Sequence, residues 1–205
     1  MAAQVQVYNH AKNIPEPVLE AFRRKEGAAN IMYPFVLKAR QFPPENQEQL
    51  WIAYFDPLGQ VTFVLSCTTR SLGTYPIFIF TTNSPAECQT ADITTPLRLL
   101  ANQLAESIAH NARVFAVFSC EPVTREFCRI WEERSGISQI QEEYYNAIFT
   151  FCTSATLTPS SNLRILPEDR NLAIELRPAD ESDLPFVARL CEEFSRTSVS
   201  DVTNP

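Results

Sequence analysis

Cysteine and histidine are the residue types in this sequence that could hold a metal ion or act as nucleophiles. The sequence contains six cysteines and two histidines, and no cysteine belongs to a CxxC pair. His10 and His110 lack ligand spacing to any cysteine, which argues against a zinc site. Cys120 could be considered a nucleophile, but no histidine is spaced to activate it. We therefore expect buried free thiols, a reducing cytosolic setting and no disulfides.

Length and charge limit the classes of protein to consider. A chain of 205 residues accommodates one sizeable domain, or one domain and a fragment. Apolar residues make up 45% and the net charge is −7, so a basic nucleic-acid footprint is absent. No apolar run approaches the roughly 20 residues that cross a bilayer, and the first residues do not resemble a secretory signal. We predict a cytoplasmic protein that binds neither nucleic acid nor membranes.

Apolar spacing predicts the elements that must position any site. In the first part of the chain we expect two helices, a hairpin and a buried central strand, at residues 15–24, 28–39, 50–55 with 61–67, and 75–81. Gly27 is predicted to end the first helix, and Pro34 to mark the first turn or a kink of the second. Residues 56–59 have the composition of a turn.

The middle of the chain continues with alternating elements. We expect a polar loop at 82–92, a helix capped by Thr94 or Thr95 with Pro96 at its first position, and a strand at 113–119. A helix over 121–134, ended by Gly136, and a last strand over 142–152 are predicted to follow. Together these elements form a first domain over residues 1–152.

The last part of the chain has a different composition. Thr, Ser and Pro dominate residues 153–171, which we interpret as a linker. Residues 172–175 form a short apolar strand, a turn follows, and an acidic amphipathic helix runs over 180–194. The sequence stops at Pro205 with no further strand signal, so residues 172–205 are expected to be the truncated start of a second domain.

This order of elements resembles the acyl-CoA N-acyltransferases of the GNAT superfamily. Residues 27–34 look like a helix of many such enzymes, and residues 50–67 look like their second and third strands. The tail, with its strand, R-P-A turn and D-x-x-D-L helix start, looks like a GNAT first strand and helix. A chain with a degenerate first GNAT-like half followed by a second GNAT-like half is similar to enzymes of the glycine N-acyltransferase type. The resemblance implies a mixed, mostly antiparallel sheet flanked by helices, with acetyl-CoA or another acyl-CoA as cofactor.

In the family, the loop that binds the cofactor has the sequence pattern Q/R-x-x-G-x-G/A and precedes the central helix. Its glycines lack side chains, so a diphosphate can approach the backbone N–H groups at the helix N-terminus. Gln89 fits the first position here, whereas Asp92 and Thr94 replace the small residues. A carboxylate would repel the diphosphate. The same residues are also explained by a helix that simply starts at 94–96 and binds no ligand. In the family the pantetheine arm enters between two parallel strands, here 77–81 and 114–119. The resemblance therefore implies cofactor binding by Phe80, Thr81, Gln89, Thr94 and Thr95.

Catalytic residues remain unassigned. The resemblance implies a Glu acting through water as general base, or a Tyr as general acid. The candidates are Asp56, Glu87, Tyr144 and Tyr145, although residues 142–145 also fit the polar start of a strand.

Three functions follow from these patterns. The first is transfer of an acyl group to a small-molecule or peptide amine, weak or absent in this chain. The second is a non-catalytic GNAT-like module that binds a protein partner or supports a missing C-terminal domain. The third is an unrelated α/β binding protein.

Overall fold

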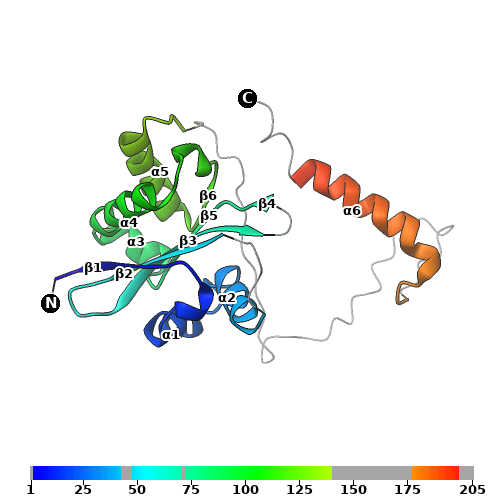
Figure 1. Cartoon of the computed structure of the whole chain (residues 1–205), viewed down its shortest axis with the longest axis horizontal. Coiled ribbons are helices and arrows are strands. Elements are labelled where there is room, and N and C mark those ends of the chain that lie inside the picture. Colours follow the sequence, from blue (N-terminus) through cyan, green and yellow to red (C-terminus); the bar gives the residue numbers. More distant parts are fainter. Residues whose placement is uncertain (1, 43–47, 71–72, 140–176, 199–205) are drawn as a thin grey trace. The chain divides into compact units, whose positions relative to one another are not determined.

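The computed structural model describes residues 2–42, 48–70, 73–139 and 177–198 (Figure 1). The chain divides into two compact units, Met1–Ala147 and Ile148–Pro205. The predicted strands at 142–152 and 172–175, the linker at 153–171, and the candidate residues Tyr144 and Tyr145 lie outside the described residues.

The first unit is built around one mixed, mostly antiparallel sheet. Its strands are β1 (Gln4–Tyr8), β2 (Gln49–Phe55), β3 (Val61–Arg70), β4 (Gly73–Thr74), β5 (Ile77–Thr81) and β6 (Val117–Phe118). They lie in the order β1-β2-β3-β5-β6, with the short β4 paired to β3. Neighbours are antiparallel except β5 and β6, which run parallel. The predicted fold class, an α/β sheet of this kind flanked by helices, is confirmed.

The predicted hairpin and central strand are confirmed. β2 pairs antiparallel with β3, and Asp56 closes the connecting turn by accepting hydrogen bonds from the N–H groups of Leu58 and Gln60. Gly59 adopts a φ of 80° in this turn, a conformation that a residue with a side chain rarely takes. β5 lies between β3 and β6 with most of its side chains buried, as its apolar composition predicts.

Helices cover both faces of the sheet (Figure 1). On one face, α1 (Glu16–Arg24) and α2 (Met32–Gln41) bury an apolar cluster that includes Phe22, Trp51 and Phe80. On the other face, α3 (Pro85–Thr90), α4 (Thr94–Ser107) and α5 (Glu121–Ser135) bury a second cluster. Leu97, Leu100 and Leu104 of α4 lie at helical spacing and are fully buried.

Helix ends agree with the sequence where the end signal is local. α5 stops at Gly136, which takes a left-handed φ of 73° as predicted. The prediction for Gly27 is wrong, because α1 ends at Arg24 and Gly27 does not have a positive φ. The second helix begins at Met32, four residues later than predicted, and Pro34 lies in its first turn.

Several other predictions need correction. The segment 4–8 forms β1, which pairs with β2 along its whole length and was not anticipated. Residues 82–92 are not a simple loop but contain α3, whose N-terminus is closed by reciprocal hydrogen bonds between Ser84 and Glu87. The strand expected at 113–119 shortens to Val117–Phe118, and its first residue, Arg113, belongs to a turn of 3₁₀ helix over Asn111–Arg113.

In the second unit, the described residues form the predicted acidic helix. A 3₁₀ turn, η3 (Glu181–Asp183), leads into α6 (Leu184–Ser198). Asp180 begins the turn by accepting the Ser182 N–H at 2.8 Å, and Arg177 pairs with Asp183 at 2.7 Å. Apolar residues on α6, namely Leu184, Phe186, Val187 and Leu190, are exposed. Within the described part of the chain, no helix is both long and apolar enough to cross a membrane.

Candidate functional site

The parallel pairing of β5 with β6 is short. Their pairing covers two residue pairs, Ile77 with Val117 and Phe78 with Phe118. The residue that follows β6 stays beside β5, because the Ser119 hydroxyl donates a 2.7 Å hydrogen bond to the Ile79 carbonyl. β5 continues to Thr81 along β3. The parallel ladder therefore ends at Phe78, before β5 itself ends at Thr81.

The N-terminus of α4 is closed by a carboxylate of its own chain. Asp92 accepts the Thr95 N–H at 3.2 Å with one oxygen and the Thr95 hydroxyl at 2.7 Å with the other. The Thr94 hydroxyl donates to Glu126 of α5 at 2.7 Å. α4 starts at Thr94, so Pro96 is its third residue rather than its first, and Asp92 rather than a threonine supplies the cap.

Both carboxylates at this helix end are held in their charged form. Hydrogen bonds from Thr95 lower the pKa of Asp92 below its usual value. Hydrogen bonding to Arg129, and then to Thr94, lowers the pKa of Glu126 despite its partial burial. The positive end of the helix dipole therefore faces two negative side chains.

The predicted cofactor residues do not share one environment. The Phe80 ring is buried against α1, in an edge-to-face contact with Phe22 at 4.9 Å. Thr81 is buried, and its hydroxyl accepts the Asn83 N–H at 3.1 Å. Gln89 lies exposed on α3. The hydroxyls of Thr94 and Thr95 are the two groups already bound to carboxylates.

The described catalytic candidates have structural roles. Asp56 shapes the β2–β3 turn. Glu87 accepts the Ser84 N–H, which lowers the pKa of Glu87. These hydrogen bonds explain why positions 56 and 87 hold carboxylates. They do not test a catalytic role for either residue.

Sequence reasoning missed two side chains at the strand and helix ends, Ser119 and Glu126. Ser119 follows the short strand β6 and bonds to β5, and Glu126 lies one helix away from Thr94. No local sequence pattern predicts either contact, because each joins residues more than thirty positions apart in the chain. The Ser84-x-x-Glu87 spacing, in contrast, is a helix-start signal that could have revealed α3.

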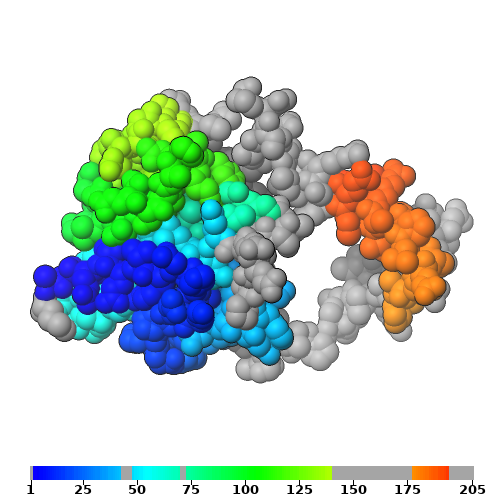
Figure 2. Space-filling view, viewed as in Figure 1, coloured from blue at the N-terminus to red at the C-terminus, as the bar shows by residue number. Residues whose placement is uncertain are grey.

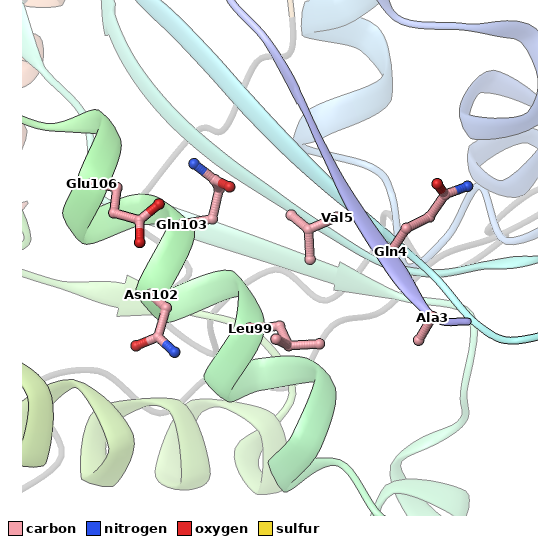
Figure 3. Close-up of a pocket in the computed structure, with 7 residues that line it drawn as sticks. All are labelled: Ala3, Gln4, Val5, Leu99, Asn102, Gln103 and Glu106. Atoms are coloured by element: carbon pink, nitrogen blue, oxygen red, sulfur yellow. The ribbon is translucent and has the colours of Figure 1, made fainter.

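A surface hollow of about 390 Å³ lies between β1 and α4 (Figure 3). It is lined by Ala3, Gln4 and Val5 on one side, and by Leu99, Asn102, Gln103 and Glu106 of α4 on the other. In Figure 2, the N-terminal residues are blue and the segment that contains α4 is green, and both lie at the surface. Its volume suits a small ligand, but none of the predicted cofactor residues lines it.

The fold and these contacts define a mixed α/β unit with a short parallel strand pair and an acid-capped central helix. No protein-family model, curated protein sequence or solved structure matches this chain. Within the described residues, no group of three or more His, Cys, Asp or Glu side chains could hold a metal ion.

Proposed function

We propose that this chain is an acyl-CoA-dependent N-acyltransferase of the GNAT type, with transfer to an amine that is weak or absent. The observation that carries the proposal is the parallel pair β5–β6, whose ladder ends at Phe78 and Phe118 while β5 continues to Thr81 along β3. A thioester cofactor of this kind has an extended arm with amide groups, which suit hydrogen bonding to the backbone of a strand beyond the end of its ladder. The sheet order, with one parallel pair next to the helix pair α4–α5, also supports the resemblance.

The diphosphate end of an acyl-CoA fits less well. An anion binds a helix N-terminus through free N–H groups and the helix dipole. Asp92 occupies the Thr95 N–H, and Glu126 lies on the Thr94 hydroxyl. A diphosphate would have to displace one carboxylate and approach the other, so we propose that this unit holds acyl-CoA poorly.

The test is calorimetric titration of the whole chain with acetyl-CoA. We expect a Kd weaker than about 100 µM, which is roughly 5.5 kcal/mol of binding free energy. The double variant Asp92→Gly, Thr94→Gly should bind more tightly, because it frees N–H groups and removes a negative charge. Asp56→Asn is the matched control, since it removes a carboxylate from the β2–β3 turn and should leave binding unchanged. Low-micromolar binding by the unaltered chain would show that the capped helix end does not exclude the cofactor.

A non-catalytic module is the second candidate, and the acid cap favours it. If neither the unaltered chain nor the glycine variant binds acetyl-CoA, and no free thiol is released with a panel of primary amines, the module is the better account. Its partner would then be a protein or a further domain. For the acyltransferase, the net charge of −7 favours a cationic amine as acceptor. We propose a cytoplasmic location for either function, which imaging of a fluorescent fusion would test.

A further inference from the structure

The strand β1 lies at an edge of the sheet and, among the described strands, pairs with β2 alone. All five of its residues take part in that pairing, and their register is unbroken. Its sequence, QVQVY, contains no charged residue and no proline. Charges, prolines and bulges are the features with which proteins protect a sheet edge against further pairing. The backbone groups on the outer side of β1 can therefore accept another strand.

One flank of α4 runs beside this edge and forms the second wall of the hollow between β1 and α4 (Figure 3). The flank consists of residues at the helical spacing i, i+3, i+4 and i+7, namely Leu99, Asn102, Gln103 and Glu106. Val5 of β1 packs against the core cluster on the α4 side of the sheet. Because side chains alternate along a strand, a strand added beside β1 would place every second side chain against this flank.

The hollow combines apolar surface with one negative charge. Leu99 is 37% exposed, and Val5 is half-buried. Glu106 is exposed and forms no hydrogen bond or ion pair within the described part of the chain. No lysine, arginine or histidine is among the described residues that line the hollow. The hollow therefore suits an apolar side chain beside Leu99 and a cationic side chain near Glu106, on a chain whose net charge is −7.

We propose that β1 and this flank of α4 bind an extended, basic segment of a protein partner, which adds a strand to the sheet. Leu99 and Glu106 are seven positions apart, which is about 10 Å along a helix and about three residues along a strand. The bound segment therefore carries an apolar and a basic residue two or four positions apart, so that both lie on one face of the added strand. This surface is separate from the start of α4, so the inference holds whether or not the chain transfers acyl groups.

Fluorescence anisotropy with the full chain tests the charge preference. The probe is a labelled peptide, Thr-Val-Thr-Val-Thr-Lys-Thr-Val-Thr, and its control carries Glu in place of Lys. We expect the Lys peptide to bind with a Kd below about 100 µM, and the Glu peptide to bind roughly tenfold more weakly at low salt. Glu106→Gln should bring the two peptides to within about twofold of each other. Glu26→Gln is the matched control, because it removes an exposed carboxylate outside the hollow and should keep the tenfold preference.

Two further Lys peptides test strand pairing without any change to the protein. One carries N-methyl groups on its odd backbone nitrogens and the other on its even ones. Because only one edge of the added strand faces β1, only one of the two should lose at least about tenfold in affinity.

Residue-level amide exchange locates the binding. The β1 amides that face away from β2 should exchange rapidly in the free chain and slowly with the Lys peptide. The proposal is overturned if the Lys peptide does not bind, if it binds no better than the Glu peptide, or if both methylated peptides lose affinity equally. Slow exchange of the outward amides in the free chain would also overturn it, because the edge would already be paired. Sedimentation would then show whether a second copy of the chain covers the edge.

Discussion

Arg113 is a single residue that connects three segments of the first unit. Its guanidinium donates to the carbonyl of Tyr75 at 2.9 Å and to the carbonyl of Thr68 at 2.9 Å. The arginine lies at the end of the 3₁₀ turn before β6, whereas its acceptors lie in β3 and just before β5. One side chain therefore holds the region where β5 begins.

Replacement of Arg113 by Ala should lower the free energy of unfolding by about 2 kcal/mol, because two partly buried carbonyls lose a charged donor. Urea unfolding measures the change. Arg125→Ala is the control, since its ion pair with Glu121 lies between exposed side chains and should contribute under about 0.5 kcal/mol. Equal losses in the two variants would mean that Arg113 acts only through surface charge.

The hydrogen bonds of Asp92 predict how the free energy of unfolding depends on pH in acid. Its pKa is lowered by hydrogen bonds present in the folded state, so its stabilising effect is complete above the ordinary carboxyl pKa of about 4. The effect is lost as the pH falls from there through the lowered pKa. Asp92→Ala should therefore cost about 1 kcal/mol at pH 7, as loss of a helix cap does, and progressively less in acid.

Unfolding curves of the native chain and of Asp92→Ala, recorded from about pH 2 to about pH 7, measure this dependence across the range in which carboxyl groups titrate. Asp92→Asn is the control, because an amide oxygen can still accept the Thr95 N–H but does not titrate in this range. A constant difference between Asp92→Ala and the native chain at every pH would contradict the role assigned to the charge.

At the scale of elements, α5 shows how a helix end is fixed by local chemistry. Its C-terminus lies at Gly136, with φ at 73°, and the space around a side chain added there is open. Gly136→Ala should therefore destabilise the protein by about 1 kcal/mol through backbone strain alone. Thermal or urea unfolding measures the loss.

Gly27 provides the comparison for Gly136. It does not have a positive φ, although its position suggested a helix end. Gly27→Ala should therefore be neutral or slightly stabilising, because alanine restricts the unfolded chain more than glycine does. Equal destabilisation by the two substitutions would show that the conformation at Gly136 is not what requires glycine.

At the scale of the whole molecule, the two units differ in how their helices use apolar residues. In the first unit, α4 buries Leu97, Leu100 and Leu104 completely. In the second unit, Leu184, Phe186 and Leu190 of α6 are 62%, 66% and 48% exposed. Because most helical stability in proteins comes from packing of an apolar face, α6 should open far more readily than α4.

Amide hydrogen exchange followed by mass spectrometry tests this difference. We expect amides of α6 to exchange at least about tenfold faster than those of α4. α5 serves as the internal control and should behave like α4, since it buries Phe127 and Ile130. Similar protection in α4 and α6 would mean that the apolar face of α6 is packed in solution.

The sequence alone determined the elements whose signals are local. The buried stripe of α4, the hairpin at Asp56 and the end of α5 at Gly136 follow from apolar spacing and turn chemistry within a few residues. The predicted fold class followed from these elements and was confirmed.

Only the tertiary structure decided how distant segments meet. The pairing of β1 with β2, the parallel pairing of β5 with β6, and the contact between Thr94 and Glu126 join residues far apart in the chain. Such contacts depend on how helices and strands pack rather than on local preference, so side-chain patterns do not specify them. The sequence placed Pro96 at the first position of this helix, whereas the folded chain begins α4 at Thr94 and shows that two carboxylates already occupy its start.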